Sequence, residues 1–157
     1  MEYTSLIAEF CERYGMDRVE PDADGAVGFD VDGRPLVLQW LESSDAVLAT
    51  VELGETPDAG AAVVNRLLMQ ANQTLFALDG MALVLNPENG HYRLMARLDV
   101  EALDFIGFDA KIARLLDRAD QWGAFLEKFV PLAVEAEANG GDAPQPADVN
   151  FTDMLRV

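Results

Sequence analysis

Few residues in this chain have side chains that could support catalysis. The only histidine, His91, follows Asn89-Gly90, a dipeptide typical of a hairpin turn, so we expect its ring to lie in solvent. No serine or cysteine nucleophile stands near His91 in the sequence, which argues against a general base there. The only cysteine, Cys11, lies on the apolar stripe of an expected helix, where Arg13 is its one basic neighbour. We therefore interpret His91 as a solvated surface residue and Cys11 as a small buried apolar residue.

Four aspartates gather around the first expected hairpin, and together they could suggest a calcium loop: Asp22, Asp24, Asp30 and Asp32. The calcium loop of a helix–loop–helix motif needs a glycine at its sharp turn, and Val27 stands at that position here. Asp30 and Asp32 also fall at the end of an alternating, strand-like segment. The interpretation is a solvated hairpin loop, and we expect no bound metal.

A third group of residues with catalytic potential is a set of carboxylates, Asp99, Asp104 and Asp109. A small-molecule enzyme that uses carboxylates alone stays open as an alternative, whereas helix capping and a solvated helix face are the favoured interpretation. The chain contains no CxxC, HExxH or GxGxxG motif, and no glycine-rich loop followed by Lys and Ser or Thr. We therefore predict that the protein is not an enzyme and uses no cofactor.

Composition restricts the classes of partner. The 157 residues carry 28 acidic and 11 basic side chains, a net charge of −17, which repels nucleic acid and anionic lipid and attracts basic partners. Solubility alone explains such acidity equally well. No apolar run reaches the roughly 20 residues of a membrane span, and the first residues are acidic where a signal peptide is basic. Together with the lone cysteine, this predicts a cytoplasmic protein.

The first half of the chain alternates between two hydrophobic periods. Residues 3–14 show helical spacing, and residues 27–31 then alternate as a strand that ends in an Asp32-Gly33 turn. Strands are also expected over 35–41 and 47–53, which gives a three-stranded antiparallel meander. The strand over 35–41 is apolar on both faces, because Val37 and Leu41 point away from its main apolar side. This pattern is typical of a central strand or of one that carries a binding surface.

The second half predicts two helices around a second hairpin. Thr56 and Pro57 have the form of a helix start, so a helix is expected over 58–78. Its polar side carries little charge, which is more typical of a hydrated protein interface than of a face exposed to solvent. Strands over 81–86 and 92–98 follow, and Asp99 could cap a last helix that Pro131 should end or kink.

The predicted fold is a single α+β domain over residues 1–134 with the order αβββαββα, a five-stranded antiparallel sheet and three helices. Residues 135–157 are rich in Gly, Pro, Ala and acids, and are expected to form a flexible acidic tail. The strands and the first helix carry more apolar residues than one sheet face can hide. The surplus points either to a protein-binding site or to a homodimer interface, and the two stay open.

This pattern resembles the class I type III secretion chaperones, a family of Tir-chaperone-like proteins, over roughly residues 3–130. The resemblance rests on the element order and acidity, together with several short stretches: Leu6-Ile7, Phe10 and Tyr14-Gly15; the Phe29-x-Val31-Asp32-Gly33 hairpin; Leu67-Leu68 and Asn72; Leu83-x-Leu85; and the run from Leu115 to Leu126 that contains Trp122.

The resemblance implies a cytoplasmic homodimer that binds the non-globular N-terminal segment of a secreted effector and keeps it soluble and competent for secretion. The implied partner-binding residues are Leu6, Ile7, Phe10, Val37 and Leu41. The implied dimer interface comprises Asn65, Leu68, Asn72, Leu75, Leu83 and Leu85. The alternative is a regulatory protein of the same fold that sequesters a folded partner, such as a transcriptional regulator. Neither role involves nucleic acid or a membrane.

Overall fold

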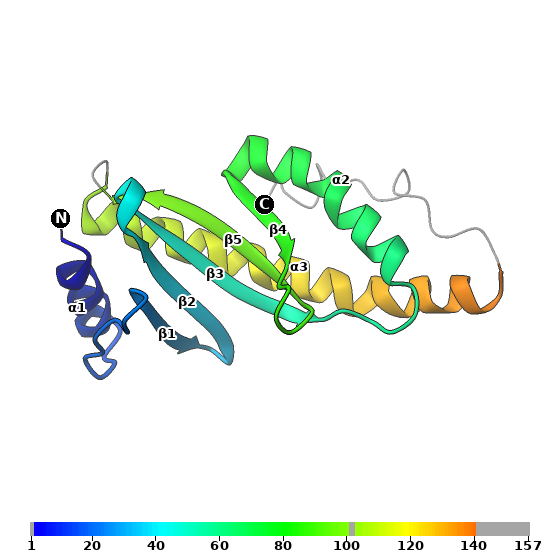
Figure 1. The fold of residues 1–157 in the computed structure, drawn as a ribbon, viewed down its shortest axis with the longest axis horizontal. Coiled ribbons are helices and arrows are strands. Elements are labelled where there is room, and N and C mark those ends of the chain that lie inside the picture. The colour runs from blue at the N-terminus through cyan, green and yellow to red at the C-terminus, as the bar shows by residue number, and fades with distance from the viewer. Residues whose placement is uncertain (1, 101–102, 141–157) are drawn as a thin grey trace. The chain divides into compact units, whose positions relative to one another are not determined.

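The computed structural model describes residues 2–100 and 103–140. The order of elements is αβββαββα as predicted, with a short 3₁₀ helix after the second strand (Figure 1). The elements are α1 (Tyr3–Arg13), β1 (Ala26–Val31), β2 (Arg34–Leu41), η1 (Glu42–Ser44), β3 (Ala46–Glu55), α2 (Ala61–Asp79), β4 (Met81–Leu85), β5 (His91–Asp99) and α3 (Phe105–Ala138). The strands form one five-stranded sheet in the order β1-β2-β3-β5-β4. The predicted α+β fold is therefore confirmed.

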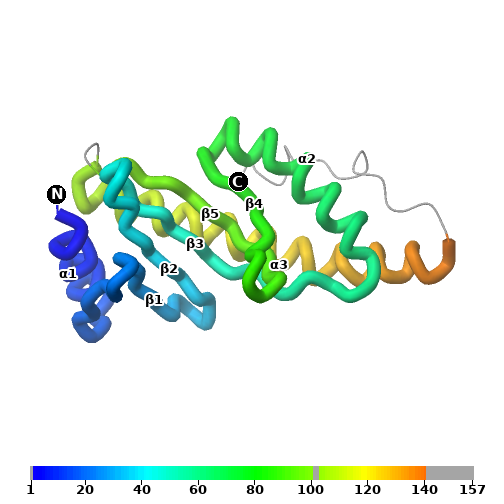
Figure 2. The backbone as a smooth tube through the Cα atoms, viewed as in Figure 1, coloured from blue at the N-terminus to red at the C-terminus, as the bar shows by residue number. Residues whose placement is uncertain are grey.

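The chain divides into two compact units, and the first joins residues 1–52 with 95–117. It contains α1 and the meander of β1, β2 and β3, which can be followed along the backbone in Figure 2. Alternate residues of the strands are buried, as the two-residue period predicts. The core of this unit combines Leu36 and Leu38 of β2 with the apolar stripes of α1 and of the first half of α3.

The first hairpin adopts the turn that its sequence predicts. Asp32 and Gly33 both have positive φ, 53° and 80°, which matches the right-handed twist of the flanking strands. The carboxylate of Asp30 accepts a hydrogen bond from the N–H of Gly33 at 2.8 Å. Asp30 and Asp32 therefore shape a turn.

The second unit joins residues 53–94 with 118–157 and contains α2, β4 and the second half of α3. The buried face of α2 is Val64, Leu67, Leu68, Ala71 and Leu75, at helical spacing. An ion pair is buried with it, because Arg118 Nε lies 2.9 Å from Asp79 Oδ2 and both side chains are almost completely shielded from solvent. Arg118 also donates from Nη1 to Gln121 Oε1 at 2.7 Å. This network fixes the end of α2 to α3.

The start of α2 differs from its prediction. The helix begins at Ala61 after Gly60, and the Thr56 hydroxyl donates to the C=O of Gly90 instead of capping the helix. The N–H of Gly60 donates to the carboxylate of Glu137, which supplies the missing cap from α3. A glycine is needed here, because its φ is 75° and a Cβ would lie 2.8 Å from the backbone carbon of Ala133.

The last helix also differs from its prediction at both ends. Its start is capped by Asp104, whose carboxylate accepts from the N–H of Gly107 at 2.8 Å, while Asp99 forms an exposed ion pair with Arg97. Pro131 does not end the helix, which runs to Ala138 and thus past the predicted domain end at residue 134. The rest of the predicted tail, residues 141–157, lies outside the described residues.

Candidate protein-interaction surfaces

The apolar stripe of α1 belongs to the core and is not on the surface. Leu6, Ile7 and Phe10 are buried, with at most 2% of each side chain exposed. The ring of Phe10 lies 5.2 Å from that of Phe29 and 6.1 Å from that of Phe108. In this conformation the helix uses these three side chains to pack on its own unit, so direct contact with a partner would require α1 to move. Their role in partner binding stays a prediction.

Two tyrosines hold α1 in place by hydrogen bonds. The Tyr3 hydroxyl donates to the C=O of Leu38 at 2.9 Å, and burial, followed by the nearby charge of Asp22, raises the pKa of Tyr3 above its usual range. The Tyr14 hydroxyl donates to Asp109 Oδ1 at 2.6 Å, and this bond to a carboxylate raises the pKa of Tyr14. Both phenols therefore stay protonated at neutral pH and act as donors.

The candidate catalytic residues each have a local structural partner. Asp109 accepts a hydrogen bond from Tyr14 and also lies 3.1 Å from Arg13 Nε. Asp104 caps α3 and Asp99 forms an ion pair with Arg97, so all three candidate carboxylates have structural roles. Cys11 is a buried free thiol, and His91 Nε2 lies 3.6 Å from Glu55 Oε1. Within residues 2–100 and 103–140, no group of three His, Cys, Asp or Glu residues could hold a metal ion.

An open sheet edge lies along β1. The N–H of Trp40 on β2 donates to the C=O of Gly25, the residue before β1, at 2.9 Å. The odd-numbered residues of β1 therefore direct their backbone groups toward β2. Even-numbered residues direct theirs outward. Pro35 fits this register, because it pairs with Asp30, at a position where β1 needs no N–H donor from β2. The backbone groups of Gly28 and Asp30 thus face the free side of β1, which is an end strand of the sheet.

The start of the same edge is closed. The N–H of Ala26 donates to Asp22 Oδ1 at 2.8 Å, and the C=O of Ala26 accepts from the N–H of Asp22 at 2.9 Å. Asp22 therefore occupies the outward position of Ala26. An added strand could therefore form backbone hydrogen bonds with β1 at Gly28 and Asp30.

An exposed apolar side chain lies next to this edge. Val37 of β2 pairs with Gly28 and is 38% exposed. Since Gly28 has no side chain, the flank of Val37 on the β1 side stays uncovered. Leu41, the other β2 residue predicted to bind a partner, is partly exposed. We call Gly28, Asp30, Val37 and Leu41 the β1–β2 surface.

Most of the residues predicted to form a dimer interface make contacts inside the second unit. Asn65 Oδ1 accepts from the hydroxyl of Tyr92 at 2.7 Å, and burial raises the pKa of this tyrosine. Asn72 binds the backbone of Leu83. Leu68, Leu75 and Leu83 are buried, and Leu85 alone of the predicted apolar set is exposed.

Sequence reasoning missed the apolar side chains that α2 does expose. Met69 is 75% exposed and Phe76 is 69% exposed. The signal was present, because Met69 and Phe76 are seven residues apart and so share one helix face outside the main apolar stripe. We group Met69 and Phe76 with Leu85 of the neighbouring strand β4, which is 47% exposed, and call these three residues the α2–β4 surface.

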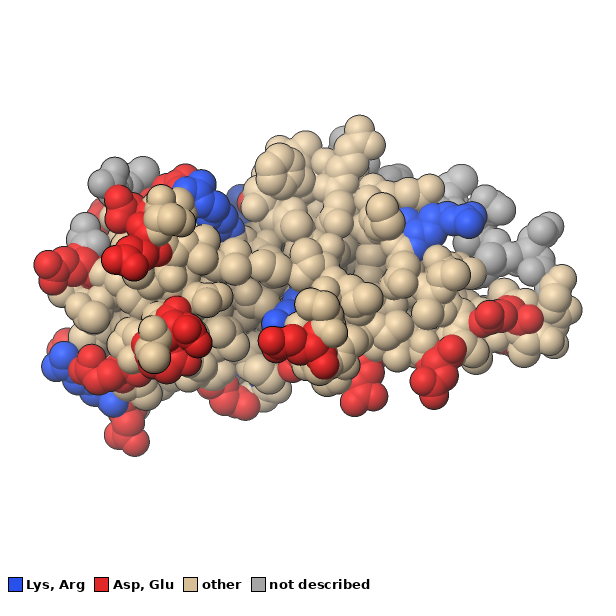
Figure 3. Space-filling view, in the orientation of Figure 1, with Lys and Arg blue, Asp and Glu red and all other residues tan. Residues whose placement is uncertain are grey.

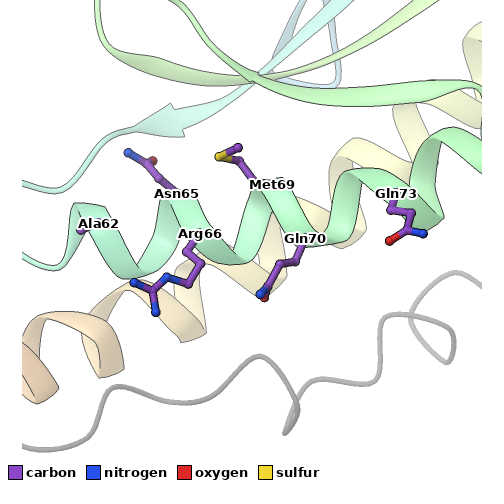
Figure 4. A pocket seen from close by; sticks show the side chains of 6 residues that line it. All are labelled: Ala62, Asn65, Arg66, Met69, Gln70 and Gln73. Carbon is purple, nitrogen blue, oxygen red and sulfur yellow. The ribbon is translucent and has the colours of Figure 1, made fainter.

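The exposed side of α2 carries little charge. A shallow hollow along it is lined by Ala62, Asn65, Arg66, Met69, Gln70 and Gln73, among which Arg66 is the single charged residue. Asn65 and Met69 project to one side of the helix, and Arg66 and Gln70 project to the other (Figure 4). Acidic side chains instead gather around α1 and along α3 in the face shown in Figure 3. Weak charge and exposed apolar side chains suit a protein interface on α2.

No helix among the described residues is both long and apolar enough to cross a membrane.

Several solved structures share this fold. The chain matches the structure described as the ExsC–ExsE complex with 24% identity and a TM-score of 0.70, over 80% of this chain and 97% of that one. It matches the HopA1–SchA chaperone–effector complex with 20% identity and a TM-score of 0.67, over 78% and 93% of the two chains. The ExoU–SpcU complex of the type III secretion system of Pseudomonas aeruginosa matches with 23% identity and a TM-score of 0.60, over 81% and 99%.

None of the curated proteins is similar enough in sequence to match the chain. The family model of the Tir chaperone protein (CesT) family matches residues 5–123. That range includes most of α1, the whole sheet, α2 and the first part of α3. The chain therefore belongs to the Tir chaperone protein (CesT) family.

Proposed function

We propose that the protein is a cytoplasmic chaperone that binds the non-globular N-terminal segment of a type III secreted effector and keeps it soluble and competent for secretion. The observation that carries this proposal is the β1–β2 surface, where Gly28 and Asp30 direct their backbone groups to the side of β1 that no described strand covers, beside the exposed side chain of Val37. An extended segment can pair with such an edge and place alternate side chains against the sheet. Globular partners rarely present a free strand of this kind.

Family membership supports the same partner class. The chain belongs to a family of chaperones, and two of the similar structures are described as chaperone–effector and type III secretion complexes. The binding mode needs no nucleotide, because the energy comes from backbone pairing and apolar contact. Part of that energy offsets the conformational entropy that the client loses when it becomes ordered.

The acidic surface supports this function in a secondary way. A net charge of −17 keeps the protein soluble while its apolar side chains are exposed, and it favours clients with basic flanks. The side chain of Asp30 stands on the strand that the client would join, so a basic client residue opposite it would gain a favourable cross-strand contact.

A change at Val37 tests the proposed binding surface. Val37→Gln removes the apolar contact and should weaken binding of the client segment about tenfold, because it removes roughly the burial of one valine side chain. The free energy of unfolding should change by less than about 1 kcal/mol, because the position is exposed. Genes of class I chaperones commonly neighbour those of their clients, so the probe is the N-terminal segment of the protein encoded by the adjacent reading frame. The measurements are its dissociation constant and urea unfolding of the chaperone variant.

The matched control is Ile106→Gln on α3, which changes an apolar side chain that is 77% exposed in the same unit. It should leave the dissociation constant unchanged. If both variants bind as the unmodified protein does, the client does not use the β1–β2 surface. Binding that requires a folded partner would instead favour the regulatory alternative.

The second part of the proposal is a homodimer formed through the α2–β4 surface. Met69→Glu combined with Phe76→Glu places two charges on this surface, and the doubly changed protein should sediment as a monomer. Leu132→Glu on α3 is the control, since Leu132 is 54% exposed in the same unit. Sedimentation equilibrium gives the masses. A doubly changed protein that keeps the mass of the unmodified one would exclude this surface as the dimer contact.

A further inference from the structure

The other end strand of the sheet is β4, whose single neighbour among the described strands is β5. The N–H of Asn86 donates to the C=O of His91 at 2.8 Å, which places Asn86 in a bonded pair with β5. Because bonded positions alternate along an antiparallel pair, Leu83 and Leu85 direct their backbone groups away from β5. An incoming strand would have to pair with these groups.

One of these positions is already occupied by a side chain. Asn72 Nδ2 donates to the C=O of Leu83 at 2.9 Å, and the N–H of Leu83 donates to Asn72 Oδ1 at 2.7 Å. A carboxamide offers one donor group and one acceptor side by side, as the backbone of a neighbouring strand does. Asn72 of α2 therefore supplies Leu83 with both bonds that a strand residue would make.

The position of this contact decides what the edge can still do. β4 has five residues, Met81–Leu85, and Leu83 is the middle one. With Leu83 occupied, Met81 and Leu85 remain as outward positions at opposite ends, which cannot support a continuous ladder. On β1, by contrast, Gly28 and Asp30 are consecutive outward positions and Asp22 closes only the start. A side chain therefore blocks the middle of the β4 edge, whereas on β1 a side chain blocks only the start of the edge.

We propose that Asn72 is an edge-capping residue that closes β4 to strand addition and leaves the β1 edge for the extended client. The part that concerns β1 rests on the proposed function, whereas the closure of β4 does not. Asn72 acts through the backbone of Leu83, so it is a positioning residue that determines where on the sheet a strand is accepted.

Asn72→Ala tests the closure directly, without a client. In dilute solution the amide of Leu83 should exchange with solvent about tenfold faster than in the unmodified protein, because its acceptor is lost. At high protein concentration this protection should return, and sedimentation should show a larger assembly, as the opened β4 edges pair between copies. Asn65→Ala is the matched control, since Asn65 lies on the same helix and binds a tyrosine hydroxyl instead of a strand. It should leave the exchange rate of the Leu83 amide in dilute solution unchanged.

A merely structural role for Asn72 predicts a different result. The Leu83 amide would then exchange faster at every concentration, and the assembly would not grow, which would overturn the proposal. Should the alanine variant fail to fold, Asn72→Asp retains the acceptor for the Leu83 N–H and loses the donor to its C=O. A folded aspartate variant that shows no growth of the assembly with concentration would also overturn the proposal. Loss of client binding in the Val37 experiment is a separate observation that bears only on the proposed function.

Discussion

Arg118→Ala is expected to lower the free energy of unfolding by about 3–5 kcal/mol. The side chain of Asp79 is fully buried and that of Arg118 is 5% exposed, so the change leaves a carboxylate without its cation inside the protein. Gln121 also loses its donor. Urea unfolding, followed by circular dichroism, measures the loss.

Arg97→Ala provides a control matched in geometry but not in burial. Arg97 Nη2 lies 2.9 Å from Asp99 Oδ1, as close as the buried pair, but 51% and 61% of the two side chains are exposed. Solvent screens this pair, so its loss should cost less than about 1 kcal/mol. Equal effects of Arg118→Ala and Arg97→Ala would show that burial of the Arg118–Asp79 pair does not determine its contribution.

Phe10→Ala is expected to lower the free energy of unfolding by about 3–5 kcal/mol, because it empties a site between three aromatic rings. The ring of Phe10 lies 4.8 Å from Tyr14, 5.2 Å from Phe29 and 6.1 Å from Phe108. The variant should lose α1 docking as a whole. Thermal and urea unfolding measure the effect.

Ile106→Ala is the matched control, since it shortens an apolar side chain of the same unit at a position that is 77% exposed. Its effect on the unfolding of the single chain should stay within about 0.5 kcal/mol. If Phe10→Ala leaves the stability unchanged and weakens only client binding, Phe10 is a surface residue after all and the packing of α1 described above is wrong.

The order of elements was predictable because local signals specify it. The alternation over 27–31 and the Asp32-Gly33 turn lead to a hairpin whatever surrounds them, and both are confirmed. The helical stripe of residues 3–14 likewise led to α1. Fold class follows from such local patterns once their order is known.

Caps and surfaces were less predictable because they depend on residues distant in the sequence. Thr56 has the right type for a helix cap, but its hydroxyl binds the C=O of Gly90, and Glu137 caps α2 from another helix. Leu6 and Ile7 could equally cover a core or form a patch, because periodicity shows which residues share a face and not what covers that face. The seven-residue spacing of Met69 and Phe76 indicates that they share a helix face, but the larger apolar stripe of α2, which packs in the core, drew the prediction to itself and this second face was overlooked.

The most direct test of the chaperone proposal is hydrogen exchange on the complex with the N-terminal segment of the protein encoded by the adjacent reading frame. The outward-facing amides of Gly28 and Asp30 should become protected on binding, the Leu83 amide should stay unchanged, and the bound segment should resist protease without forming a globular domain. Protection elsewhere with none at Gly28 and Asp30, or binding of a folded partner alone, would show that the protein does not hold an extended client at the β1 edge.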